Sequence, residues 1–308
     1  MKHNTHIYIA SKAIEFLHDS VDNMQTPGGT AAELATRAKI KQKAVDLQRL
    51  LRSHQEAIVE ASWAPDDVLG DKSIYHTFKL FTDQEFPDAP KFAAETHERN
   101  NKKYYRVKGG GGLAYKVDHL ARLIADLTKL RAHNDHFNQQ QIIYLYLMIS
   151  HYVIDAHVPM HCDIRDNPPS DNDTTKPRPK ERYYANSLHD QIEDLWEKAC
   201  TPAALAECGL VADTSDDYFQ ETNLTPQVRF SLKEKNDVNL IRPYAISDRG
   251  LMDFMIDICV QAKERSLKLF PINNPSQYDQ AALPALTREI FADAIGDLIT
   301  VYLWMWGE

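Results

Sequence analysis

Three histidines and an aspartate lie within the eleven-residue stretch HYVIDAHVPMH, which runs from His151 to His161 at the end of an apolar segment. His151 and Asp155 are four residues apart, so on a helix they project from the same face. Pro159 cannot continue the helical hydrogen bonds, and it biases Val158 away from helical geometry. The chain therefore turns here, and His161 can reach back toward His151 and Asp155.

A second imidazole and carboxylate, His189 and Glu193 in the stretch SLHDQIE, are again four residues apart. Imidazole nitrogen and carboxylate oxygen are ligands that suit zinc. Either pair alone is compatible with a simple ion pair on a helix. Both pairs together favour a metal site, because unpaired charges on an apolar helix are costly. With His161 they offer more ligands than one tetrahedral ion needs, which indicates a multinuclear site.

Two further segments precede these pairs: NTHIYIASKAIEFL near the amino terminus, and ASWAPDD at residues 61 to 67. Together with HYVIDAHVPMH and SLHDQIE, and in the same order, they resemble the zinc-dependent phospholipase C and single-strand nuclease superfamily. The first segment resembles the family's first helix, which carries a His ligand. The second resembles the loop that supplies an Asp, with a His ligand following it. The resemblance covers residues 4 to 193.

The resemblance implies a site for two to three zinc ions. The matching positions of this chain are Met1, His6, Asp66, His76, His151, Asp155, His161, His189 and Glu193. It implies one ion among His76, His151 and Asp155. Asp66 would either ligate that ion, as in the nuclease branch, or act as the general base, as in the phospholipase branch.

The resemblance implies that His161, His189 and Glu193 hold a second ion. The third would lie among His6, the bridging Asp155, and the amine and carbonyl of the first residue.

The chain departs from the family pattern at two places. The family begins its mature chain with Trp, whereas this sequence begins with Met1, although the gap to His6 is the one seen in the nuclease branch. Backbone atoms are the ligands, so Met1 can serve directly; alternatively His3 replaces it, or the third site is weak. The Asn that follows the family signature is also missing after His161, where Cys162 stands.

Neighbouring residues compete for some of these assignments. Asp66 is preferred to Asp67 because it follows Pro65 as in the family's Pro-Asp. His76 is preferred to His54, which precedes the aspartate instead of following it. His157 is two residues from Asp155 and is expected to face elsewhere on the helix. Packing or surface roles are expected for Cys162, His119, His133 and His136.

The elements that must position these residues are predicted to be helices. Apolar residues recur at spacings of three and four in six stretches, at 5–18, 113–130, 139–157, 188–199, 251–270 and 286–304. Three stretches, at 66–108, 167–180 and 212–250, are predicted to be irregular, and Gly109 to Gly112 a flexible turn. Alternating strand patterns are scarce. We therefore expect an all-α, single-domain multi-helix bundle over 1–308, with long loops. The resemblance implies a phospholipase C and single-strand nuclease-like fold that 199–308 completes.

The composition is that of an ordinary globular protein, with 43% hydrophobic and 26% charged residues. A net charge of -9, with no long basic stretch, disfavours a broad nucleic-acid surface but leaves room for a short single strand. The four cysteines form no CxxC pair, which favours reduced thiols. No apolar segment is long enough to span a bilayer, and no protein partner is indicated. Without a signal sequence a cytoplasmic protein is expected, or a secreted one whose signal has been removed.

The function expected from these observations is that of a zinc-dependent phosphodiester hydrolase. Phospholipase C-like cleavage of a phospholipid head group by a metal-activated water is preferred, because the signature lacks the Gln common in the nuclease version. The alternative is a single-strand nuclease or 3′-nucleotidase with the same site. A third hypothesis is an HD-type phosphohydrolase, in which Asp190 and not Glu193 is the ligand. A scaffold with structural zinc is disfavoured, since such a site is usually a closed four-ligand shell.

Overall fold

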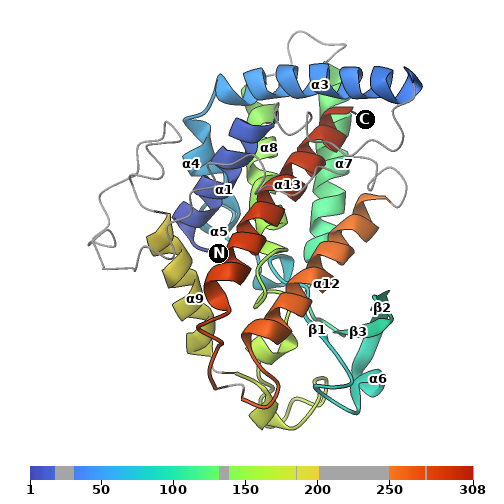
Figure 1. Cartoon of the computed structure of the whole chain (residues 1–308), viewed down its shortest axis with the longest axis vertical. Helices are drawn as coiled ribbons and strands as arrows, with labels where there is room; N and C mark the ends of the chain where they lie inside the picture. The colour runs from blue at the N-terminus through green and yellow to red at the C-terminus, as the bar shows by residue number, and fades with distance from the viewer. Residues whose placement is uncertain (18–30, 132–138, 185, 201–249, 275, 308) are drawn as a thin grey trace.

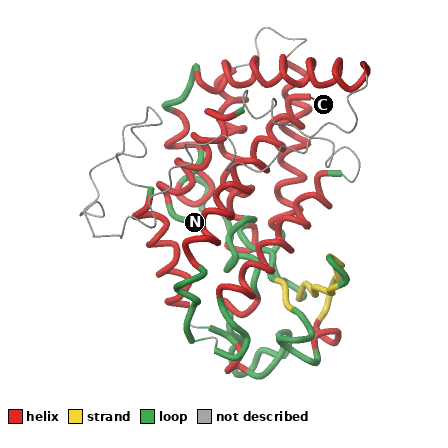
Figure 2. The backbone as a smooth tube through the Cα atoms, viewed as in Figure 1, coloured by secondary structure: helices red, strands yellow, loops and turns green. Residues whose placement is uncertain are grey.

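The computed structural model describes residues 1–17, 31–131, 139–184, 186–200, 250–274 and 276–307. These residues are mostly helical, as predicted, and form one elongated body (Figure 1). The expectation of an all-α protein was wrong in one respect, because a small three-stranded antiparallel sheet lies at one end of the helices (Figure 2). The predicted irregular stretch at 212–249, together with His133 and His136, lies outside the described residues.

The body of the molecule consists of five long helices: α1 (His3–Phe16), α7 (Leu113–Arg131), α8 (Gln139–Asp155), α12 (Leu251–Leu269) and α13 (Leu283–Gly307). Helix α13 packs against α1, α7, α8 and α12, so helices from both ends of the described chain share one apolar core. All five coincide with predicted helices to within a few residues. Their repeating apolar faces gain most of their stability by packing on one another.

Four other helices surround this core: α3 (Ala31–Arg52), α4 (Ala57–Ala61), α5 (Ala64–Asp67) and α9 (Asn186–Ala199). Figure 1 shows α3 lying across one end of the bundle and α9 alongside its opposite half. Helix α9 was predicted, whereas α3 was not among the six predicted stretches. Charged residues interrupt the sequence of α3, and this weakens the apolar repeat by which a helix is recognised.

Helix α8 is buried almost throughout, and from Tyr146 to Asp155 every residue is buried. It ends as the sequence predicts. The backbone N–H groups of His157 and Val158 bond three residues back, to the carbonyls of Ile154 and Asp155, both at 3.0 Å. These tighter turns and Pro159 stop the helix. The end of α8 therefore places Asp155 deep inside the molecule.

The sheet lies within 66–108, which was predicted to be irregular. It has the order β1-β3-β2, formed by β1 (Leu80–Phe81), β2 (Ala93–Arg99) and β3 (Lys102–Val107), with the short helix α6 (Ala89–Phe92) before β2. Asn100 and Asn101, both at positive φ, make the tight turn between β2 and β3. Asparagine adopts this conformation more readily than most residues, so a hairpin can form there.

The chain that follows α8 runs beside the segment that carries His76. The N–H of Phe78 bonds to the carbonyl of His161 at 3.0 Å, and that of Leu80 to the carbonyl of Cys162 at 2.9 Å. Short 3₁₀ turns lie on either side of this contact, at Ser73–Tyr75 and Ile164–Asp166, and a third lies at Lys180–Arg182. Backbone pairing thus brings His76 close to the end of α8.

Four fully buried charges fix the same region to α12. The Arg165 guanidinium lies 2.7 Å from the Asp163 carboxylate and 2.8 Å from that of Glu85. The Lys263 ammonium on α12 lies 2.6 Å from Glu85 and 2.7 Å from Asp163. Two positive and two negative groups therefore compensate one another away from solvent.

The predicted glycine turn is present, and it is closely packed at one position. Gly111 has a φ of 98°, and a Cβ on it would lie 2.0 Å from the backbone oxygen of Thr77. Only glycine fits there without displacing the chain next to His76. Within the described ranges, no helix is both long and apolar enough to cross a membrane.

Candidate metal centre

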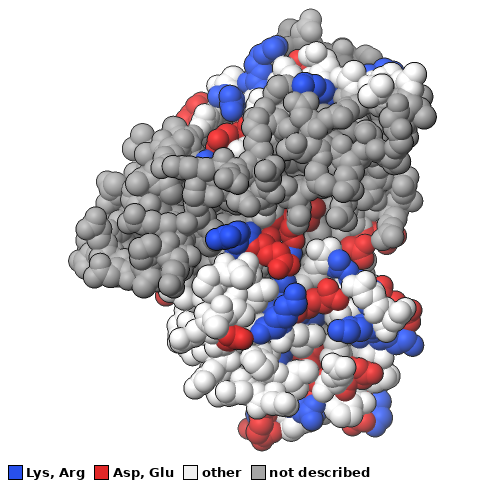
Figure 3. Space-filling model, viewed as in Figure 1, with Lys and Arg blue, Asp and Glu red and all other residues white. Residues whose placement is uncertain are grey.

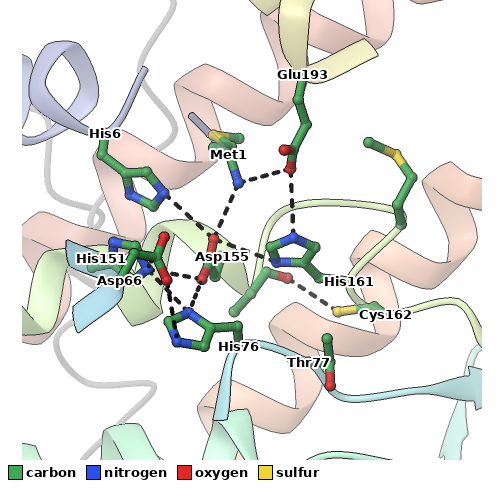
Figure 4. A network of polar contacts seen from close by, with 12 residues as sticks. Met1, His6, Asp66, His76, Thr77, His151, Asp155, His161, Cys162 and Glu193 are labelled. Carbon is green, nitrogen blue, oxygen red and sulfur yellow. Dashed lines mark hydrogen bonds and ion pairs between the residues drawn. The ribbon is translucent and has the colours of Figure 1, made fainter. Parts of the chain in front are cut away.

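Nine side chains and backbone groups predicted to hold zinc converge at one place, where the amino terminus meets the ends of α5 and α8 and the face of α9. Figure 4 shows Asp155 in the middle of this cluster, with the terminal amine, Glu193 and four histidines around it. The cluster is drawn from five separate segments of the chain. The site therefore depends on the tertiary fold and not on any single motif.

The two oxygens of the buried Asp155 carboxylate face different groups. Oδ1 lies 3.3 Å from the terminal amine of Met1, 3.5 Å from His6 Nε2 and 3.4 Å from His161 Nδ1. Oδ2 lies 2.9 Å from His76 Nδ1 and 3.3 Å from His151 Nε2. A carboxylate placed in this way can bridge two cations.

Asp66, from the short helix α5, closes one side of the cluster. Its Oδ1 is 3.5 Å from His76 Nε2, and its Oδ2 is 3.5 Å from His151 Nε2. Its side chain remains 37% exposed, against 1% for Asp155. Asp66 is thus more accessible to solvent than Asp155.

Glu193, from α9, closes the other side. Its Oε1 lies 2.8 Å from the terminal amine, 3.0 Å from His189 Nε2 and 3.5 Å from His161 Nε2. His189 and Glu193 therefore do share one face of a helix, as their spacing predicts.

Three groups of potential ligand atoms result, each with its atoms within 4.8 Å of one another: His6, His151 and Asp155; Asp66, His76 and His151; and His161, His189 and Glu193. One of them, His161, His189 and Glu193, coincides with a predicted ligand set, and the other two overlap the predicted sets in part. Asp155 belongs to only one of the groups, although the resemblance implies that it bridges two ions. His151 belongs to two of the groups, whereas the resemblance implied it for one only.

Several of these histidines have a buried ring nitrogen without a hydrogen-bond partner. Among the described residues neither ring nitrogen of His6 has a hydrogen-bond partner, and the same holds for His76 Nε2 and His161 Nδ1. Leaving a buried polar atom unsatisfied costs about 1–3 kcal/mol. Coordination of a cation would satisfy these nitrogens, so the donor set fits a metal ion and fits poorly as a purely packed core.

The protein environment sets the charge of the carboxylates. Burial alone would raise the pKa of Asp155, but the terminal ammonium and the imidazoles of His161 and His151 hold it well below its ordinary value. The pKa of Glu193 is likewise held low against burial by the ammonium, His161 and His189. Both groups are therefore carboxylates, the form that binds metal.

Two of the histidines are kept neutral. Burial and the neighbouring His151 lower the pKa of His6 well below its ordinary value. Burial also lowers the pKa of His161, despite the opposing charge of Asp155. Neutral imidazole is the form that coordinates a metal.

Two groups hold protons instead. Burial opposes charge on His189, but hydrogen bonds to Asp166 and Glu193 outweigh it and raise its pKa to about 9. The terminal amine is also opposed by burial, and Glu193 and Asp155 raise its pKa to about 10. A cation entering the site must displace these two protons.

A second layer of contacts, which the sequence analysis missed, orients two of the rings. His151 Nδ1 donates to the carbonyl of Ser62 at 3.0 Å, which leaves Nε2 directed at the carboxylates. His189 Nδ1 lies 3.1 Å from Asp166 Oδ2, and Lys79 pairs with the same oxygen at 3.0 Å. Such contacts fix the tautomer and direction of a ligating ring. No spacing rule links Asp166 to His189, so sequence alone gave no signal for it.

The competing residues lie elsewhere. Asp67 is exposed, and His54 hydrogen-bonds to Ser53 Oγ at 2.9 Å, away from the cluster. His157 is buried on another face of the chain, with Nε2 3.4 Å from Asp297. Cys162 is buried, and its thiol donates to the carbonyl of Ala156 at 3.5 Å (Figure 4). His119 is exposed, as expected.

An open pocket of about 760 Å³ leads to the cluster. Its wall combines ligand candidates with other side chains, among them Trp63, Ile74, Lys79, Lys108 and Lys176. A drug-sized or headgroup-sized molecule fits such a volume. A closed structural metal site would not need this opening.

No family model, curated protein or solved structure matches the chain in the three comparisons made.

Proposed function

We propose that the protein is a zinc-dependent phosphodiester hydrolase, with phospholipase C-like cleavage of a phospholipid head group as its activity. The observation that carries the proposal is the position of Asp155. Its two oxygens face two different sets of histidines at the base of an open pocket. That arrangement suits a multinuclear metal centre with access for a substrate.

Zinc is the ion that the donor set favours. Histidine nitrogens and carboxylate oxygens without thiolates suit zinc, and the ordered motifs resemble a zinc-dependent family. When bound, neighbouring zinc ions supply Lewis acidity toward a phosphoryl oxygen and lower the pKa of a water molecule. Asp155 and Glu193, held as carboxylates, supply the compensating negative charge.

Asp66 is the residue best placed to act on the reacting water. It lines the pocket and is far more exposed than Asp155, yet it stays within 3.5 Å of His76 and His151. A carboxylate in this position can orient a water molecule and accept its proton. Ligation and proton transfer both remain open roles for it.

A single-strand nuclease or 3′-nucleotidase is the second candidate, and one contact favours it. Asp66 reaches both His76 and His151, which is where the resemblance places it in the nuclease branch. Trp63, in the pocket wall, could stack on a base. Against long polynucleotides, Figure 3 displays acidic and basic side chains interspersed over the described part of the visible face.

Hydrolysis by the purified, zinc-loaded chain tests the proposal. A short-chain phosphatidylcholine and a single-stranded oligonucleotide are compared, each with and without a chelator. We expect chelator-sensitive release of phosphocholine. Cleavage of the oligonucleotide alone would transfer the proposal to the nuclease branch, and no turnover of either substrate would contradict it.

Asp66→Asn and Asp67→Asn provide a matched pair for the same assay. Only the first carboxylate contacts the cluster, so we expect Asp66→Asn to lower turnover by at least about 100-fold, as for loss of a general base. Asp67→Asn should leave turnover near the wild-type value. Equal effects of the two changes would contradict the assignment.

A further inference from the structure

A tyrosine, an aspartate and a lysine form a hydrogen-bonded network beside the metal centre. The Tyr152 hydroxyl, from α8, donates to Asp71 Oδ2, and the ammonium of Lys116, from α7, lies 3.1 Å from the same oxygen. Tyr152 is fully buried, whereas the side chains of Asp71 and Lys116 are 17% and 22% exposed. We call these three residues the Asp71 network. It connects α7 and α8 to the stretch of chain between α5 and β1.

The protein environment fixes which groups of the network are charged. Burial would raise the pKa of Asp71, but the hydrogen bond from Tyr152 and the neighbouring Lys116 lower it, so Asp71 is a carboxylate. Burial and the hydrogen bond to Asp71 raise the pKa of Tyr152, so the phenol keeps its proton and is the donor. Such a charge-assisted hydrogen bond is roughly twice as strong as a neutral one.

The network joins the two stretches of chain that supply one ligand group, that of Asp66, His76 and His151. Tyr152 directly follows His151 in α8, and its ring centroid lies 5.5 Å from that of His76. Asp71 lies midway along the chain between Asp66 and His76. One hydrogen bond therefore holds the stretch that carries two of the ligands against the helix that carries the third.

The stretch 67–75 is held only in part by apolar packing. Three of its apolar side chains, Val68, Leu69 and Ile74, are 68%, 54% and 45% exposed. The Asp71 side chain instead contacts α7 and α8 through the rest of the network. A stretch with few buried apolar contacts opens at a low cost in free energy. The Asp71 network is thus an attachment on which the position of both ends of this stretch depends.

We infer that the hydrogen bond from Tyr152 to Asp71 positions the ligand group that contains Asp66, and so sets the affinity of this group for zinc. The inference rests on the proposed function, which assigns zinc to the group. Tyr152 and Asp71 are positioning residues here, because neither belongs to the three groups of potential ligand atoms. The ligand group that contains Glu193 is supplied by other stretches of chain, so its zinc ion should be unaffected.

The test is the zinc affinity of the full chain, measured by competition with a chromophoric chelator. Tyr152→Phe removes the hydroxyl and keeps the ring beside His76. We expect it to weaken the binding of one zinc ion by about tenfold, the lower end of the effect of losing a residue that orients a ligand, and to leave the other zinc unchanged. Tyr104→Phe is the matched control, since this fully buried tyrosine also donates to a carboxylate, that of Glu264, at 2.8 Å. The control should bind all its zinc as the wild type does.

Asp71→Ala provides an independent check of the same hydrogen bond. It should weaken the same zinc ion about as much, and the double variant with Tyr152→Phe should bind no more weakly than either single variant. A lower melting temperature with unchanged zinc affinity, or an equal weakening of every zinc ion, would overturn the inference. If the wild type shows zinc-dependent turnover and Tyr152→Phe keeps its zinc affinity, the inference alone fails. A wild-type chain that binds no zinc would overturn the proposed function as well.

Discussion

At the scale of single residues, the centre is organised around one buried carboxylate. Asp155 is 1% exposed and is surrounded by four histidines and the terminal amine. His151 was predictable as its neighbour, because the His-x-x-x-Asp spacing expresses the helical repeat directly, whereas His6 and His76 were expected only from the family resemblance. Ser62 and Asp166, which orient the rings of His151 and His189, could not be predicted, because they reach these histidines only through the tertiary fold.

Glu193 and Asp190, on the same helix, distinguish this arrangement from an HD-type site. Glu193 contacts the terminal amine, His161 and His189, whereas Asp190 is exposed at the edge of the pocket. We expect Glu193→Gln to remove about one zinc ion per chain, because its group loses an anionic ligand. Asp190→Asn should retain all of them. Metal analysis after dialysis measures this, and zinc loss from the Asp190 variant would support the HD-type hypothesis.

Asp166 is predicted to act through His189 as a positioning residue. Asp166→Asn should weaken zinc binding by about 10–100-fold, the usual effect of losing the partner of a ligating histidine. Asp171→Asn, in the same loop but with its side chain 93% exposed, is the control. Competition with a chromophoric chelator gives the affinities. A lowered melting temperature with unchanged zinc affinity would show that Asp166 has only a structural role.

At the scale of elements, the long helices were predictable and the sheet was not. The helices repeat apolar residues over many turns, whereas the exposed and half-buried positions of β2 (AAETHER) are mostly polar. Its strand character comes from backbone pairing with β3, which a hydrophobic pattern does not reveal. The Asn100-Asn101 turn was the available signal, because both residues adopt positive φ.

The glycine turn before α7 gives a prediction at this scale. Gly111→Ala should lower the free energy of unfolding by about 1–3 kcal/mol or more, because the position combines positive φ with a close backbone contact. Gly112→Ala is the control, since its nearest neighbour to a Cβ is 4.0 Å away. Urea denaturation of both variants measures the difference. Equal stability of the Gly111→Ala and Gly112→Ala variants would show that the backbone near Thr77 can move to accommodate a Cβ without a loss of stability.

At the scale of the whole molecule, the metal centre and a buried ion network connect the same distant segments. The loop after α8 carries His161 and, a few residues later, Asp163 and Arg165. Asp163 pairs with Lys263 of α12, and Arg165 pairs with Glu85. No sequence pattern indicated that these four charges would meet. Their burial follows from the packing of α12 against the sheet.

The stability of this network depends on pH in a defined direction. Burial would raise the pKa of Asp163, but Arg165 and Lys263 hold it well below its ordinary value. Asp163 therefore contributes fully to the free energy of unfolding when the pH is above about 4, the pKa of an aspartate in the unfolded chain. This contribution is lost as the pH falls further, through the lower pKa of Asp163 in the folded protein.

Asp163→Asn should accordingly cost about 3–5 kcal/mol at pH 7, because it leaves buried cations uncompensated. The difference from the wild type should shrink as the pH is lowered below about 4. Asp88→Asn, which breaks an exposed pair with Lys91, is the control and should cost less than about 1 kcal/mol. Denaturation at a series of pH values measures both, and a difference independent of pH would contradict the account.

The measurement that bears most directly on the central claim is anomalous diffraction at the zinc absorption edge from crystals of the zinc-loaded protein. We expect two to three peaks around Asp155, among the three ligand groups that contain His6, His76 and His189. Absence of zinc, or zinc bound away from Asp155, would show that these residues do not form a zinc centre.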